Sequence, residues 1–224
     1  MKDQNPFRLI RGGQGCDGQT CGCSGSGGEE KPPPDLGLEC GAPMRHPMVR
    51  TGDRVLVAGS DMARTVFPIA VRVGPFGRVL GVEEDDALLR RALDGIEPFN
   101  YLTGLSNVAF RKGARSALPA DDGRTDVVYL QWRQARPPDL PPALKEAHRV
   151  LRAGGRLFLG FSGFVDGHCS RRVAMMAEAA GFSRLRSLGE GSPGRSDPGD
   201  GGRLTFVALK PKAEGGGHPH EAST

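Results

Sequence analysis

Residues 52–84 have a hydrophobic pattern that predicts a strand, a helix and a second strand in succession. Short apolar runs occupy 55–58 and 78–82, and the positions from 62 to 73 between them have helical spacing. Glu83 directly follows the second apolar run. In open α/β sheets, an acid at the carboxyl end of this strand can accept hydrogen bonds from ribose hydroxyls. The pattern therefore indicates a nucleotide site.

The rest of the chain continues the alternation of short apolar runs with amphipathic segments. Further strands are expected at 107–112, 125–130 (continuing to 132), 156–161, 182–188 and 204–210, and helices at 85–95, 142–151 and about 170–180. No helical pattern separates the last two strands. This order predicts an α/β fold: a Rossmann-like, doubly wound, mostly parallel seven-stranded sheet with an antiparallel last strand.

Three local features refine these elements. Pro68 lies inside the first helix and costs about 3 kcal/mol unless the helix kinks. Gly154 and Gly155 are expected to end the helix at 142–151 with a left-handed turn. His148 on that helix is interpreted as a packed residue rather than a catalyst.

Composition divides the chain into three parts. Many of the 34 glycines and 18 prolines lie towards the ends of the 224-residue chain. Residues 1–34 are a Gly-, Cys- and Pro-rich segment expected to be disordered, 35–210 form the domain, and 211–224 are a second disordered tail. The domain alone is long enough to bury a stable core.

The charge and cysteine content narrow the class of protein. A net charge of +4, spread over the chain, gives little support for nucleic-acid binding, and no apolar run is long enough to span a membrane. The start lacks the apolar core of a signal peptide, so a cytoplasmic location is expected. Cys16, Cys21 and Cys23 could converge on one soft ion, or could be reactive thiols of an unstructured tail.

Several motifs give this chain a resemblance to a known family. LECGAP at 38–43, GDRVLVAGS at 52–60 and ALKEAHRVLRAGGRLFLG at 143–160 resemble the class I S-adenosylmethionine-dependent methyltransferases, and most of all the arsenite methyltransferase group. The resemblance implies methyl transfer from S-adenosylmethionine to a thiolate-bound metalloid such as arsenite, or to another small acceptor. Because positioning can supply most of the rate of such a transfer, no catalytic acid or base is named.

The same resemblance implies the cofactor-binding residues. The turn after the first strand would wrap the methionine part, the acid after the second strand would hold the ribose hydroxyls, and the turn after the third strand would flank the adenine. The residues at these places, with one more at the end of the fourth strand, are Gly59, Ser60, Asp61, Glu83, Gly113, Ala114, Arg115 and Gln131. Cys40 and Cys169 match positions at which arsenite enzymes carry arsenic-binding cysteines.

The cofactor-binding motif is degenerate. Val57 and Ala114 stand where the family carries acids, and Asp61 and Ala63 stand where it carries glycines. These departures support an alternative hypothesis: a catalytically inactive protein with the methyltransferase fold, acting as a binding or regulatory subunit with a protein partner, or as a thiol-based binder of metals or metalloids.

Overall fold

A computed structural model describes residues 49–59, 62–133, 137–162, 167–191 and 203–212. They belong to one compact unit, Pro33–Thr224. Ser60, Asp61 and Cys40 lie outside the described residues, as does the amino-terminal cysteine cluster.

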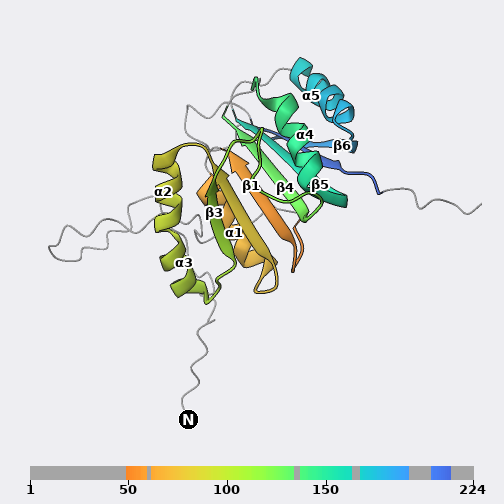
Figure 1. Cartoon of the computed structure of the whole chain (residues 1–224). Coiled ribbons are helices and arrows are strands. Elements are labelled where there is room, and N and C mark those ends of the chain that lie inside the picture. Colours follow the sequence, from red (N-terminus) through yellow and green to blue (C-terminus); the bar gives the residue numbers. More distant parts are fainter. Residues whose placement is uncertain (1–48, 60–61, 134–136, 163–166, 192–202, 213–224) are drawn as a thin grey trace, which may run out of the picture. The chain divides into compact units, whose positions relative to one another are not determined.

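The described residues form one seven-stranded sheet with helices between the strands (Figure 1). In chain order the elements are β1 (Arg54–Gly59), α1 (Met62–Val73), β2 (Arg78–Glu83), α2 (Asp86–Asp94), α3 (Ile96–Thr103), β3 (Val108–Lys112), β4 (Thr125–Trp132), α4 (Leu140–Val150), β5 (Leu151–Ser162), α5 (Gly167–Ala179), β6 (Ser183–Gly191) and β7 (Arg203–Leu209). The strand order is β3-β2-β1-β4-β5-β7-β6, and β7 runs antiparallel to both of its neighbours. The predicted fold is confirmed.

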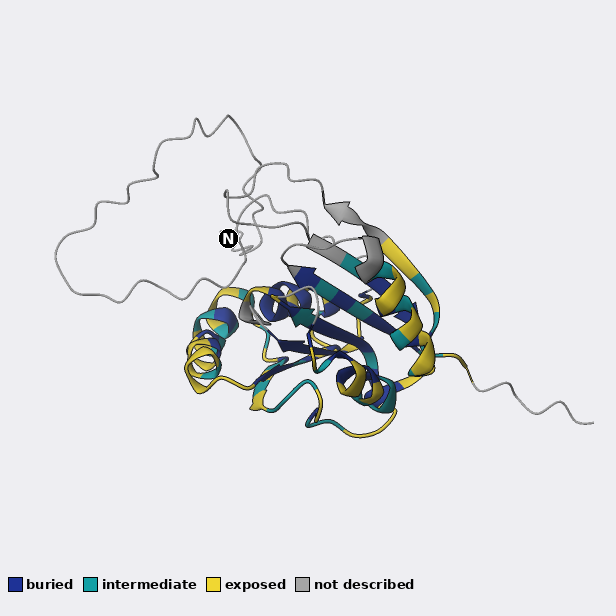
Figure 2. Ribbon diagram, turned by 90° about the horizontal axis from the view of Figure 1, so that it is seen from above, coloured by how far each residue is buried: buried dark blue, intermediate teal, exposed yellow. Residues whose placement is uncertain are grey.

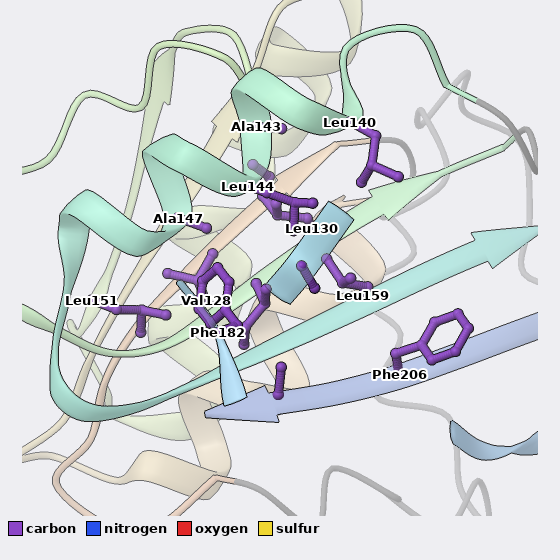
Figure 3. Close-up of a cluster of buried hydrophobic side chains, with 14 of the residues drawn as sticks. Val128, Leu130, Leu140, Ala143, Leu144, Ala147, Leu151, Leu159, Phe182 and Phe206 are labelled. Atoms are coloured by element: carbon purple, nitrogen blue, oxygen red, sulfur yellow. The ribbon is translucent and has the colours of Figure 1, made fainter. Parts of the chain in front are cut away.

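Two apolar layers cover the two faces of the sheet. On one face, α1 packs its buried side chains, including Phe67 and Ile69, against Val55 and Val57 of β1. On the other face, the buried side of α4 lies over β4 and β5, where Leu144 faces Leu130 (Figure 3). Buried residues concentrate along the central strands, and exposed ones lie on the outer sides of the helices (Figure 2). Continuous apolar strands are expected where a parallel sheet is covered on both faces.

The starts and ends of the first helices follow local chemistry. Asp85 caps α2: its Oδ1 accepts hydrogen bonds from the amides of Ala87 at 2.8 Å and Leu88 at 2.9 Å. These bonds satisfy two amides that have no partner within the helix. Pro68 lies inside α1, which nevertheless continues to Val73.

One helix was not predicted, and the end of another was predicted wrongly. Residues 96–103 form a separate helix, α3, which the sequence pattern had not indicated. The helix α4 ends at Val150 without a glycine, because the next residue, Leu151, is extended and pairs with Thr125 of β4. Gly154 does have a positive φ of 75°, but it lies within the segment assigned to β5. His148 is packed as predicted, its ring edge-to-face with Phe182 at 5.2 Å.

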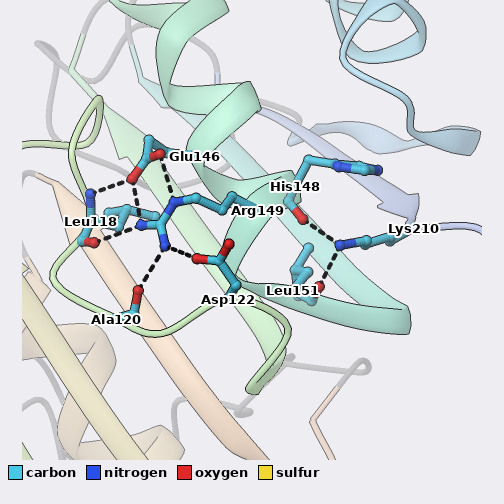
Figure 4. A network of polar contacts seen from close by, with 8 residues as sticks. All are labelled: Leu118, Ala120, Asp122, Glu146, His148, Arg149, Leu151 and Lys210. Atoms are coloured by element: carbon cyan, nitrogen blue, oxygen red, sulfur yellow. Dashed lines mark hydrogen bonds and ion pairs between the residues drawn. The ribbon is translucent and has the colours of Figure 1, made fainter.

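The segment between β3 and β4 contains no helix, and Arg149 of α4 holds it in place (Figure 4). Its guanidinium donates hydrogen bonds to the carbonyl oxygens of Leu118 and Ala120, each at 3.0 Å, and pairs with Asp122. Glu146 accepts from Arg149 at 2.7 Å and from the amide of Leu118 at 2.9 Å. The hydrogen bond from Arg149 lowers the pKa of Glu146. This ion pair therefore fixes the segment to α4.

We predict that Glu146→Gln lowers the free energy of unfolding by about 1–2 kcal/mol near neutral pH. Because the pKa of Glu146 is lower in the folded protein than its ordinary value of 4.5, its stabilising effect is complete above that value and declines as the pH falls below it. Urea unfolding at several pH values measures this. A deficit in the variant that does not shrink on acidification would contradict the prediction.

Candidate functional site

The candidate site lies at the edge of the sheet where the parallel strands β1 to β4 end, which we call the carboxyl edge. Gly59 of β1 pairs with Gln131 of β4, and Glu83 of β2 pairs with Lys112 of β3. Gly113 follows directly, and its amide donates to the carbonyl oxygen of Glu83 at 3.1 Å. The sheet thus brings together the predicted residues from four adjacent strands.

Gly59 permits the close approach of β1 and β4. Its φ is 114°, and a Cβ at this position would lie 2.1 Å from the carbonyl oxygen of Gln131. No side chain fits there. The same Cβ would lie 3.0 Å from Nη1 of Arg115, so the Arg115 guanidinium lies against this turn.

Glu83 provides a buried carboxylate at the centre of the carboxyl edge, with 7% of its surface exposed. Its Oε1 accepts hydrogen bonds from the amides of Glu84 at 2.9 Å and Asp85 at 3.2 Å. Its Oε2 accepts none from the residues that the structure describes. The carboxylate is therefore held in a fixed orientation with one oxygen free to accept hydrogen bonds from a ligand.

Arg115 connects three segments at the carboxyl edge. Its Nε donates to Asp139 at 2.9 Å, Nη2 lies 4.0 Å from a carboxylate oxygen of Glu84, and the guanidinium lies 5.6 Å from the ring centroid of Trp132. The indole of Trp132 also donates to Asp139, at 3.0 Å, and stacks on Phe161. Planar guanidinium groups are suited to binding a carboxylate and an aromatic face together.

Trp132 and Asp139 were not predicted as site residues from the sequence. Trp132 directly follows Gln131 at the end of a strand, and Asp139 precedes α4. These positions in the sequence could have indicated that both residues lie at the carboxyl edge. Thr65 of α1 was not predicted either; it is buried at the same edge, and its hydroxyl oxygen accepts a hydrogen bond from Nε2 of Gln131 at 3.3 Å.

Ala114 and Cys169 are the remaining predicted residues that the structure describes. Ala114 lies in a short bridge with Ala117, and offers no side-chain acceptor. Cys169 lies in the first turn of α5, on the segment that follows the carboxyl end of β5. Within the described ranges, no group of three His, Cys, Asp or Glu side chains could hold a metal ion. None of the helices in the described part of the chain is long and apolar enough to cross a membrane.

The fold and a family match together show which class of proteins this domain resembles. Residues 55–155 match the family model of a methyltransferase domain. This match covers less than half of the chain, and together with the seven-stranded topology it makes the domain similar to the class I S-adenosylmethionine-dependent methyltransferases. The chain has the fold of an arsenic (III) S-adenosylmethionine methyltransferase from Chlamydomonas reinhardtii, with a TM-score of 0.60, 22% identity, and coverage of 74% of this chain and 65% of the other.

Two curated relatives illustrate the range of similar proteins. An arsenite methyltransferase from Halobacterium salinarum is 32% identical over 55% of this chain and 30% of its own length. A demethylmenaquinone methyltransferase from Lactococcus lactis is 33% identical over 41% of this chain and 34% of its own length. The chain thus spans about a third of the length of each of these relatives, and the two differ in the acceptor their names imply.

We predict that Gly59→Ala destabilises the domain by at least about 3 kcal/mol, because the added methyl group overlaps the backbone of Gln131. Gly123→Ala is the matched control: Gly123 also has a positive φ, of 62°, but a Cβ there meets nothing within 4 Å. It should lose only about 1–2 kcal/mol, from the left-handed backbone alone. Thermal unfolding measures both, and equal losses would contradict the steric explanation.

Proposed function

We propose that this chain is an S-adenosylmethionine-dependent methyltransferase whose acceptor is a thiolate-bound metalloid such as arsenite, or another small molecule. The observation that carries the proposal is the Glu83 carboxylate, buried at the end of β2, with Oε1 bonded to backbone amides and Oε2 without a donor from the described chain. A fixed acceptor at this point of an α/β sheet suits a ribose diol.

The residues present fit the cofactor at its ribose end. Glu83 would hold the ribose, Gly59 would keep the first turn close to β4, and the turn at Gly113 would border the adenine. Val57 is fully buried against α1, so its side chain cannot contact a ligand at the carboxyl edge. Val57 therefore does not take over the role of the acid that the family carries at this position.

The chain's own contribution would be binding and orientation. When bound, the cofactor would supply an electrophilic methyl group. Arg115 ties the segments after β2 and β4 together through Glu84 and Asp139, which would fix the walls beside the cofactor. Holding donor and acceptor in line is the main source of rate for an acceptor that already carries a lone pair.

The similarity to arsenite methyltransferases and the placement of Cys169 support a metalloid acceptor. Cys169 lies in the first turn of α5, the helix that follows β5. Because β5 is parallel to β4, it ends at the same edge of the sheet as the strands that carry Gly59 and Glu83. Thiolates suit soft, thiophilic centres such as trivalent arsenic. The similarity to a demethylmenaquinone methyltransferase supports the broader statement of a small acceptor.

A second candidate is a protein that keeps the fold without the chemistry. Ala114 offers no side-chain acceptor at the adenine edge, and the Arg115 guanidinium lies against the Gly59 turn. A cation there disfavours a positively charged sulfonium nearby. In this case the protein would act as a binding or regulatory subunit for a protein partner or a thiophilic ion.

We predict that S-adenosylhomocysteine binds the reduced protein and that Glu83→Gln weakens binding at least about tenfold, since two hydrogen bonds to a charged acceptor are lost. Isothermal titration calorimetry measures both affinities. Glu97→Gln, an exposed acid on α3, is the control and should bind like the unmodified chain. Failure to bind at millimolar cofactor would favour the second candidate.

The acceptor is tested separately. Incubation of the protein with S-adenosylmethionine, arsenite and a thiol should yield methylated arsenic, and Cys169→Ser should reduce the yield. Cofactor binding without any methylated arsenic would reject arsenite and leave a methyltransferase with a different acceptor. Mass spectrometry of the products distinguishes these results.

A further inference from the structure

A groove lies on the face of the sheet that carries α4, along the amino-terminal parts of β1 and β2. Its volume is about 740 Å³, within the range of about 300–1,000 Å³ that small-molecule sites usually have. Four arginines line it, so we call it the arginine groove: Arg54, Arg78, Arg111 and Arg124. It begins at the first residues of β1 and β2, the opposite edge of the sheet from Glu83.

The arginines form a cluster at one end of the groove. Arg54 and Arg78 are register partners on neighbouring strands, which are about 4.8 Å apart. Arg124 immediately precedes β4, the other neighbour of β1. Arg111 pairs with Val82, four residues beyond Arg78 on β2, or about 13 Å along the strand. The groove therefore has three cations at one end and a fourth further along.

These charges are not neutralised by the described chain. The side chains of Arg54, Arg78 and Arg124 make no ion pair there, and all three are exposed. The neighbouring carboxylates are already engaged: Asp53 binds Arg156 at 2.7 Å, and Asp126 binds Arg152. Asp121 is the single acid among the lining residues, so the lining carries four positive charges against one negative. Adjacent like charges repel, and a bound anion would remove this repulsion.

The floor and one wall of the groove are apolar and fixed. Leu80 and Ala109 are register partners on β2 and β3 and lie between the two arginine positions. Leu118 and Ala120 form the wall, and Arg149 of α4 binds the carbonyl oxygens of both (Figure 4). Because this wall is already ordered, the entropic cost of binding a ligand against it is lower.

We propose that the arginine groove binds an organic phosphate of nucleotide size. The phosphate would contact Arg54, Arg78 and Arg124, because one guanidinium group can donate two parallel hydrogen bonds to two oxygens of a phosphate. The organic body would lie over Leu80 and Ala109 towards Arg111. The limited volume of the groove and the clustering of charge at one end favour a small ligand over an extended polymer. This site is separate from the proposed cofactor site and does not depend on it.

The test is calorimetric titration of inorganic pyrophosphate and of adenosine diphosphate into the full chain. Both should bind saturably, with adenosine diphosphate tighter because it also covers the apolar floor. Arg54→Ala combined with Arg78→Ala should weaken both ligands at least about tenfold. Arg90→Ala combined with Arg91→Ala removes two exposed arginines from α2 and should leave both affinities within about twofold.

A further variant separates the two ends of the groove. Ala109→Glu places a carboxylate at an exposed floor position, and should weaken adenosine diphosphate more than pyrophosphate. Failure of either ligand to bind saturably at about 10 mM would overturn the proposal. Equal weakening by the two arginine pairs would also overturn it. So would binding of a single-stranded oligonucleotide through Arg54 and Arg78 without binding of either small ligand. S-adenosylhomocysteine binding should be unchanged in all these variants, which separates this result from the proposed function.

Discussion

The close approach of β1 and β4 at Gly59 is the constraint on which the carboxyl edge depends. The strand order changes direction here: β2 and β3 lie on one side of β1, and β4 and β5 on the other. The chain after β1 leads to α1 on one face, and the chain after β4 leads to α4 on the opposite face. A crevice between diverging connections is where open α/β sheets bind ligands. Only glycine allows the two strand ends to remain paired up to this point.

The sequence was sufficient for the sheet because each buried strand is a short apolar run bounded by polar or glycine residues. It was insufficient where a boundary depends on tertiary contacts. Gly95, between α2 and α3, has a right-handed helical conformation with φ −80° and ψ −14°. It does not end α2 with the left-handed turn that a glycine in the sequence usually signals. At Leu151, pairing with β4 ends the helix before the glycines that the sequence offered as its terminus.

The candidate site was predictable in part for the same reason. Glu83 and Gly59 follow apolar runs directly, so their places at strand ends could be read from spacing. The role of Arg115 could not, since it depends on Asp139, which is 24 residues away, and on Trp132. The family resemblance predicts Arg115 beside the adenine of the cofactor, and in the structure its guanidinium lies against the Gly59 turn.

One helix-free segment connects the two sites. Residues 113–115 border the carboxyl edge, and residues 118–121 with Arg124 border the arginine groove. A helix in this place would be held by its own backbone hydrogen bonds, but this segment is held by side chains: Arg115 to Asp139 at its start, and Arg149 with Glu146 at its middle. Both anchors come from the β4–α4 region. The position of α4 on β4 and β5 therefore determines the shape of both sites, which lie at opposite edges of the same sheet.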